Sequence, residues 1–177
     1  MPIQSPIPVL TLAAGRTRTD VSVTPPAGFE SGEGDLEVSL AQISTDLIFA
    51  GDAIEMATFK MGAAESESID VTPLASANKV MLQGLDQFEA NVVVYRSVTD
   101  DEPDADDAVY ALLGAKGVVS YWFVREVKRA KVPLADGDTG WVYKCRSDNP
   151  IAGESNTALT ARIPLTVITR RPFTITA

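Results

Sequence analysis

Two stretches decide the fold, FEANVVVYRS at residues 88–97 and GVVSYWFVREVKR at residues 117–129. Both are dominated by β-branched and aromatic residues, which is typical of strands. The segment GWVYKCRS at 140–147 adds a clear alternation that places Trp141, Tyr143 and Cys145 on one face. These segments predict long, half-buried or buried strands, and therefore a mainly β protein.

A short helix is expected between the two deciding strands, over about residues 104–113. The preceding run DDEPDADD at 100–107 holds six acids in eight positions, and Asp104 or Asp106 can cap the helix. Gly114 is the expected stop at the other end. An apolar stripe at helical spacing is supplied by Val109, Leu112 and Leu113.

Outside this region the sequence contains one further long strand signal and several shorter ones. Residues 157–169 (TALTARIPLTVIT) predict one more long strand, at an edge or with a bulge at Pro164, and the following RRPFTITA is expected to be extended. Weaker strand signals occur at residues 36–40, 46–61, 69–72 and 79–82. The expected architecture is a β-sandwich or barrel with one short flanking helix.

The first 26 residues contain five prolines and are expected to form an extended arm, because proline fixes φ and lacks an N–H donor. Residues 27–177 are expected to form a single domain, a size that suits one compact core. No apolar stretch is long enough to predict a membrane span, and the N-terminus lacks the basic residues of a secretory signal.

The composition argues against catalysis. The 177 residues include no histidine and a single cysteine, Cys145. This removes histidine-based nucleophile activation, the common zinc ligand sets and disulfides within the chain. We expect no enzyme, no cofactor and no metal site.

Four segments invite a functional interpretation, and each has a simpler structural one. The acids at 100–107 lack the ligand spacing of a calcium loop and are better explained as a helix cap on a solvated loop. DGDTG at 136–140 is typical of a tight turn. Cys145 points away from its basic neighbours and is expected to be buried. The basic patch KRAK at 128–131 is too small for a nucleic-acid site in an acidic chain.

The formal net charge of −9 is unevenly spread. Residues 1–107 carry 5 basic and 19 acidic groups, whereas residues 108–177 carry 10 basic and 5 acidic groups. Overall negative charge disfavours binding to DNA phosphates. The asymmetry favours head-to-tail contact between copies, if the two halves also separate in space; solvated acidic loops are the alternative explanation.

The order of elements in about residues 85–172 resembles the major tail tube proteins of long-tailed bacteriophages. The resemblance rests on NVVVYRS, then DDEPDADDAVYALLGAKG, then VVSYWFVREV, with ALTARIPLTVI closing the pattern. It implies a β-sandwich with a flanking helix, related to the inner tubes of contractile tails and of type VI secretion. It also implies hexameric rings whose inner sheets join into one barrel, and which stack into a conduit for the genome.

The resemblance further implies partners and a location. The partners are other copies of the chain, the tape measure protein, the terminator and the baseplate or tip; DNA passes through without specific binding, and an acidic lumen would repel it. The location is the virion tail, assembled in the host cytoplasm. The candidate interface residues are Arg16, Arg18, Asp104, Asp106, Asp107, Lys128, Arg129, Arg170 and Arg171.

Other functions stay open at this point. A tail terminator, a head–tail connector or a capsid decoration protein would share the structural character of the chain. A ligand-binding β module would need aromatic and polar groups that converge on a concave site. Trp122 and Trp141 are the only tryptophans, and both lie in predicted strands.

Overall fold

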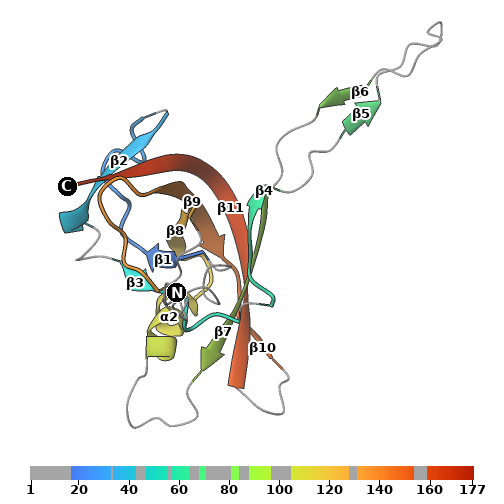
Figure 1. Cartoon of the computed structure of the whole chain (residues 1–177). Coiled ribbons are helices and arrows are strands. Elements are labelled where there is room, and N and C mark those ends of the chain that lie inside the picture. Colours follow the sequence, from blue (N-terminus) through green and yellow to red (C-terminus); the bar gives the residue numbers. More distant parts are fainter. Residues whose placement is uncertain are drawn as a thin grey trace, which may run out of the picture.

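The computed structural model describes residues 17–32, 34–42, 47–55, 57–63, 68–70, 81–83, 88–96, 105–127, 131–153 and 159–177. The strands in these residues are β1 (Thr19–Ser22), β2 (Leu36–Ser39), β3 (Ile48–Phe49), β4 (Lys60–Ala63), β5 (Ser68–Asp70), β6 (Met81–Gln83), β7 (Phe88–Arg96), β8 (Val119–Arg125), β9 (Thr139–Ser147), β10 (Ile151–Ala152) and β11 (Leu159–Thr176). Nine of them form one sheet in the order β3-β1-β8-β9-β11-β7-β4, with β10 and β2 also paired to β11 (Figure 1).

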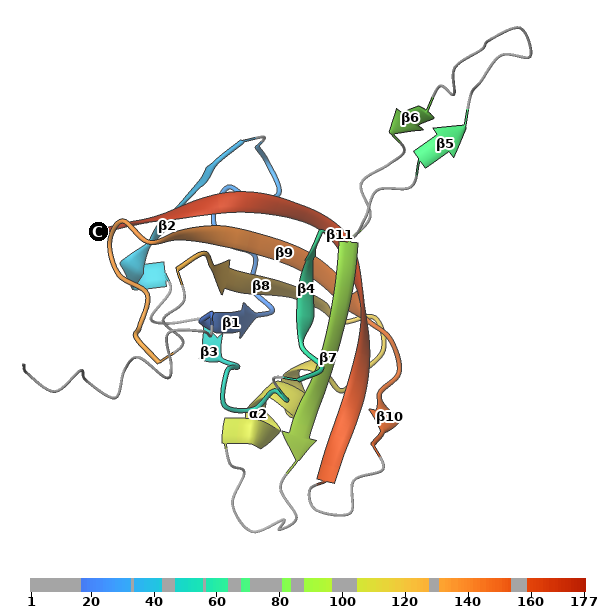
Figure 2. The same ribbon diagram turned by 45° about the vertical axis from the view of Figure 1, so that its right-hand side comes forward.

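The long strand β11 belongs to both halves of this sheet. Residues 159–164 pair with β7, and residues 165–174 pair with β9. We call β3, β1, β8, β9, β2 and the second part of β11 sheet A. We call β4, β7, β10 and the first part of β11 sheet B. The strand bends between them, so that sheet B stands at a steep angle to sheet A (Figure 2).

Two cores lie on the two faces of sheet A. The first core fills the space between sheet A, sheet B and the helix α2 (Ala105–Leu113), and it includes Trp122 and Cys145. The second core lies on the opposite face, under β2 and the residues before it, and includes Phe123 and Val142. Adjacent residues of β8 and β9 therefore point into different cores, as the alternation in the sequence predicts.

The predicted mainly β fold with a flanking helix is confirmed. Helix α2 matches the expected range, and Val109 and Leu113 are fully buried in the first core. Gly114 ends the helix without a left-handed φ. A side chain there would bring its Cβ within 2.7 Å of the carbonyl oxygen of Tyr110, so that glycine is needed for space. A second short helical segment, which includes residues 40–42, was not expected.

Two local predictions need correction. Residues 19–22, assigned to the arm, form β1 inside sheet A, with all four residues buried. Residues 1–16 lie outside the described residues, so the arm itself stays a prediction. Residues 151–152, for which no strand was predicted, pair with β11 as β10. The basic tail is extended, as predicted, and forms the last part of β11.

Pro164 lies where β11 changes partner. It is the last residue of the ladder to β7, and on the other edge it lies between the pairing with β10 and the pairing with β9. The bulge that proline was expected to cause occurs later, with a register shift between Val167 and Thr169. A residue without an N–H fits best where the ladder is interrupted.

Candidate subunit interface

Arg18, a predicted interface residue, precedes β1 and pairs with Asp20 of the same chain. Its guanidinium donates two hydrogen bonds to the carboxylate, from Nε at 2.7 Å and from Nη2 at 2.8 Å. The guanidinium carbon also lies 4.5 Å from the centre of the Phe49 ring. Burial raises the pKa of Asp20, while the hydrogen bond and charge of Arg18 oppose that rise. Arg18 thus stabilises the start of β1, and its part in an interface stays a prediction.

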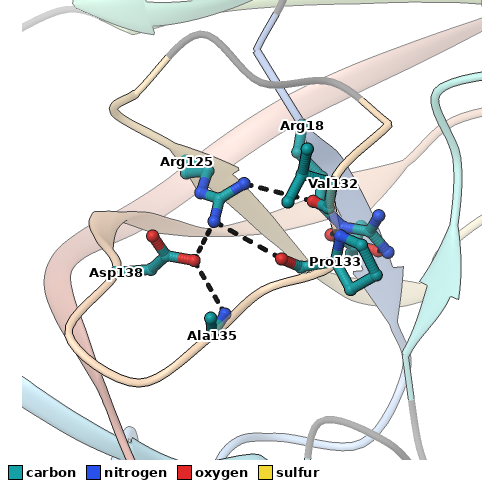
Figure 3. A network of polar contacts seen from close by, with 7 residues as sticks. Arg18, Arg125, Val132, Pro133, Ala135 and Asp138 are labelled. Atoms are coloured by element: carbon teal, nitrogen blue, oxygen red, sulfur yellow. Dashed lines mark hydrogen bonds and ion pairs between the residues drawn. The ribbon is translucent and has the colours of Figure 1, made fainter.

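A buried ion pair that the sequence analysis did not single out joins Arg125, the last residue of β8, to Asp138 (Figure 3). The same guanidinium donates to the carbonyl oxygens of Val132 at 3.1 Å and Pro133 at 3.4 Å. The Asp138 carboxylate accepts a hydrogen bond from the backbone N–H of Ala135 at 2.7 Å. Together these contacts fix the loop that leads into β9 across the end of β8.

This ion pair could have been predicted from the alternation of residues in the strand and from the acidic turn nearby. Arg125 follows Tyr121 and Phe123 at alternate positions of one strand, which predicts that its side chain enters the same buried face. A buried arginine needs a carboxylate, and the nearby DGDTG turn offers one. The basic residues Lys128 and Arg129 belong to this loop but lie outside the described residues.

Arg171, another predicted interface residue, holds a loop of its own chain. Its Nη1 donates to the carbonyl oxygens of Gly28 at 2.6 Å and Phe29 at 2.8 Å, and its Nε donates to that of Gly34 at 3.1 Å. The two glycines have φ angles of +76° and +91°, in the left-handed region that favours glycine. The loop 28–34 is therefore shaped by its glycines and fastened to β11 by one arginine.

Glu30 fastens the same loop to β8 and β9. Lys144 Nζ donates to its two carboxylate oxygens at 2.7 and 2.9 Å, and the Tyr121 hydroxyl donates to one of them at 2.6 Å. The hydrogen bonds from Lys144 and Tyr121 lower the pKa of Glu30. Burial, with the hydrogen bond and charge of Glu30, raises the pKa of Tyr121 to about 12. The loop thereby closes the second core.

Arg170 is packed between two aromatic rings. Its guanidinium carbon lies 4.3 Å from the ring centre of Trp141 and 4.9 Å from that of Phe88. Such stacking is favourable because the ring faces attract a cation. Arg170 thus links β11 to β9 and to the start of β7, and its predicted role between subunits is not tested by this contact.

The remaining charged candidates lie apart from these arginines or outside the described residues. Asp107 is half-buried on α2, and Asp106 lies on the same helix with a side chain that is not described. Asp104 and Arg16 fall outside the described residues. The described candidates therefore do not gather into one charged patch; they lie at the start of β1, on α2 and along β11.

The other segments considered in the sequence show no site chemistry. Cys145 is fully buried, and burial raises the pKa of its thiol to about 12. DGDTG forms the predicted turn, with Gly137 at φ +81°. In the part of the chain that the structure describes, no three metal-ligating side chains come together. None of its helices is long and apolar enough to span a membrane.

Comparison with known proteins assigns the chain to a family. A family model described as "Phage tail tube protein" matches residues 7–173. The chain belongs to the phage tail tube protein family. No curated protein matches the sequence. One similar solved structure, described as the cryo-EM structure of the anti-feeding prophage (AFP) baseplate, 6-fold symmetrised, shares 12% identity over 89% of this chain and 91% of that chain, with a TM-score of 0.42. That likeness is too weak to support an argument.

The family confirms the resemblance identified from the sequence. A tail tube protein is a structural, non-catalytic component of the phage tail in the virion. It forms homo-oligomers and meets other tail proteins, so its functional surfaces are the contacts between chains.

Two strand edges of this tail tube protein are available for such contacts. Among the described residues, β4 pairs only with β7, and β10 pairs only with β11, so both edges of sheet B are open. Open edges readily pair with strands of other chains. Sequence reasoning did not find them, because the order of strands in a sheet is not encoded in local alternation.

The pair β5 and β6 is a second candidate contact. It forms a two-stranded sheet of its own, and it lies well away from sheets A and B (Figures 1 and 2). Both strands match weak strand signals in the sequence, at residues 69–72 and 79–82, but the sequence did not indicate that they lie apart.

Proposed function

We propose that copies of this tail tube protein form rings, expected to be hexameric, and that these rings stack into the tube through which DNA enters the host cell. The observation that carries the proposal is the pair of open edges on sheet B. When β4 of one copy pairs with β10 of the next, the sheet continues from subunit to subunit and closes into a barrel. Closure leaves no exposed edge.

The two open edges are short, which disfavours association of only two copies. β4 has four residues and β10 has two, so that a single pair of copies gains few backbone hydrogen bonds. Each such bond contributes about 1 kcal/mol net. A closed ring makes all of these contacts at once, and therefore favours the complete ring over free dimers.

The β5–β6 pair supports stacking of one ring on another. An isolated two-stranded hairpin is only marginally stable in water. A hairpin that stands apart from its own domain therefore gains stability when it packs on a neighbour. We propose that it packs on a subunit of the adjacent ring, together with the N-terminal arm.

Charge is proposed to guide the same contact. The acidic residues Asp104, Asp106 and Asp107 come from the acidic part of the chain, and Lys128 and Arg129 come from the basic part. Opposite charges on successive rings favour a repeating, head-to-tail arrangement. Other proteins at the two ends of the tube, such as a terminator and a baseplate, would limit its length.

The test is negative-stain electron microscopy of the purified, concentrated protein, with light scattering on the same sample. Hollow tubes or stacked rings of uniform width are expected. A variant with residues 66–85 replaced by a short glycine–serine linker is expected to form single rings that do not stack. If the unmodified protein stays monomeric at high concentration and also when tail-tip complexes are added as nuclei, the proposal is wrong.

A further inference from the structure

An open cleft lies at the rim of the second core, on the face of sheet A that carries this core. Its volume is about 520 Å³, which falls within the roughly 300–1,000 Å³ of ordinary binding pockets. A narrower groove, which reaches Ser22 and Thr24, shares Leu47 with the cleft. The two follow the chain along β1, and we call them together the β1 groove. The cleft itself is lined mainly by Arg18, Asp20, Leu40, Leu47, Pro133 and Leu134.

Contacts within the chain hold the walls of the β1 groove in place. Pro133 belongs to the loop that the Arg125 guanidinium fixes, since Arg125 donates to the carbonyl oxygens of Val132 and Pro133 (Figure 3). Leu134 is buried in the second core, and Leu40 and Leu47 pack against that core. The groove is therefore a formed feature of the fold, and its lining is largely apolar.

The floor of the groove carries two charges that neutralise each other. Asp20 pairs with Phe123 in the register of β1 and β8, so its side chain faces the second core. Asp20 is 2% exposed, and its carboxylate accepts two hydrogen bonds from Arg18, at 2.7 and 2.8 Å. A charged occupant would lose its hydration in this groove and find no unpaired charge in return. The β1 groove therefore suits an uncharged, apolar segment.

The N-terminal arm contains such a segment. Residues 1–15 include no charged side chain, and IPVLTL at residues 7–12 is their longest nearly continuous apolar stretch. Pro6 and Pro8 lack an N–H donor, which lowers the cost of packing on a sheet face that offers no open strand edge. The match to the tail tube family begins at residue 7, so it includes this stretch.

The arm is joined to the chain at the groove itself. The described residues begin at Thr17, and the next residue, Arg18, lines the cleft. Residues 13–16 (AAGR) are available to reverse the chain, because Gly15 tolerates the left-handed φ of a tight turn.

The length of the segment also fits. Six extended residues span roughly 20 Å at about 3.3 Å per residue. The stretch of chain from Arg18 to Thr24, which the groove follows, has a similar length. A short tether also gives the arm an effective concentration in roughly the millimolar range at its own groove. In dilute solution the arm of the same subunit therefore outcompetes the arm of any other copy.

We propose that residues 7–12 pack into the β1 groove of their own subunit before assembly, and that this contact holds the arm back from stacking. The consequence for stacking rests on the proposed function, in which the arm packs on a subunit of the adjacent ring. The same six residues cannot occupy both places. The arm must therefore leave its own groove before it binds a neighbour, and docking in the free subunit delays the growth of the tube.

Distances between spin labels on the full chain test the docking. Native Cys145 is fully buried and burial raises the pKa of its thiol, so it is expected to stay unlabelled. T11C places one label in the arm, and A41C places the other at an exposed residue that lines the cleft. Pulsed electron paramagnetic resonance should give a short distance with a narrow distribution, also after dilution with unlabelled protein.

Two pairs of charged substitutions serve as test and control. V9D/L10D puts two carboxylates into the segment that docks, and it should convert the narrow distribution to a long, broad one. Q4D/S5D adds the same two charges outside residues 7–12 and should keep the short distance. Circular dichroism should show both variants to be folded, since the substitutions lie in the arm.

Two results would overturn the docking. One is a broad distribution in the T11C/A41C protein that equals that of V9D/L10D. The other is a short distance that disappears on dilution with unlabelled protein, because the groove would then hold the arm of another copy. A13C/A41C repeats the measurement with the arm label outside residues 7–12, so that a label which itself blocks docking is recognised.

The lag before tube growth tests the effect on stacking. A41R places a long charged side chain in the cleft and leaves the arm unchanged, so light scattering should show a lag several-fold shorter than that of the unmodified protein. A111R adds the same charge on the exposed side of α2 and should leave the lag as it is. An equal or longer lag for A41R would show that the docked arm does not delay stacking. Failure of the unmodified protein to form tubes would count against the ring assembly, whereas the spin-label distances test the docking without any tube.

Discussion

Arg125 and Asp138 form an ion pair that ties the last residue of β8 to the turn before β9. Only 2% of the Arg125 side chain and 17% of the Asp138 side chain are exposed. A buried ion pair of this kind contributes little more to stability than an apolar pair of the same shape. Removal of one partner, however, leaves the other charge buried and uncompensated, which is strongly destabilising. The ion pair therefore fixes the conformation of the loop, because any arrangement that separates the guanidinium from the carboxylate is strongly disfavoured.

Removal of the Asp138 carboxylate alone should therefore be strongly destabilising. D138A is expected to lower the free energy of unfolding by about 3 kcal/mol, since the Arg125 guanidinium stays buried without its carboxylate. Urea unfolding followed by tryptophan fluorescence measures the change. D136A removes an exposed carboxylate from the same turn and should change stability by less than about 0.5 kcal/mol. Equal losses of stability in the two variants would show that the buried carboxylate contributes no more to stability than the exposed one.

The contact of Glu30 with Lys144 and Tyr121 predicts a pH dependence. The pKa of Glu30 lies below its ordinary value of 4.5 in the folded protein, so the stabilisation is complete above about pH 4.5 and is lost as the pH falls through the folded value. The difference in urea midpoint between the unmodified protein and E30Q should be present at pH 7 and vanish in acid. A difference that persists unchanged at pH 3 would contradict the assignment.

The hydroxyl of Tyr121 offers an independent readout of the same contact. Its pKa of about 12 is raised in part by the Glu30 charge, so E30Q should move its ionisation to lower pH. Absorbance titration of the phenolate, with Y121F to assign the signal, measures the shift. No shift in E30Q would mean that burial alone sets the pKa of Tyr121.

Gly140 is predicted to be intolerant of any side chain. A Cβ at this position would overlap the carbonyl oxygen of Val124 and lie 2.7 Å from Cε1 of Phe173, because β9 is enclosed by β8 and β11 here. G140A should lower stability by about 2 kcal/mol through overpacking. The control G62A places its Cβ in β4 with no atom within 4 Å and should have little effect on unfolding in urea. A G140A protein as stable as G62A would refute this reading of the packing.

Local periodicity in the sequence was enough to predict several features. The helix over 104–113, the alternation of residues 140–147 and the burial of Cys145 were all predicted correctly, because each depends on the spacing of apolar residues within one element. The turn at DGDTG was predicted for a similar reason, since its chemistry is local.

Features that depend on distant residues were missed. Residues 19–22 were assigned to an arm because prolines flank them, whereas their pairing with β3 and β8 is tertiary. Arg171 was predicted from the sequence only as an interface residue, and it is the fold that brings the carbonyl oxygens of Gly28 and Gly34 to it. The open edges of sheet B follow from strand order, which no single segment specifies.

The edge strand β10 gives a direct test of ring closure. Ile151 is 53% exposed on this strand, and a lysine at an edge strand opposes pairing with another chain. I151K should remain folded, with a stability within about 0.5 kcal/mol of the unmodified protein, since the side chain is exposed. Rings and tubes should be absent in electron microscopy of this variant.

Ile168 provides the matched control, because it is 47% exposed but lies at the bulge of β11 rather than on an open edge. I168K makes the same change in size, charge and hydrophobicity, and so it should form tubes of normal width and length. The comparison separates edge pairing from a general effect of surface charge. Normal tubes from I151K would place the subunit contact elsewhere than β10, whereas loss of tubes in both variants would point to the added charge and not to the edge.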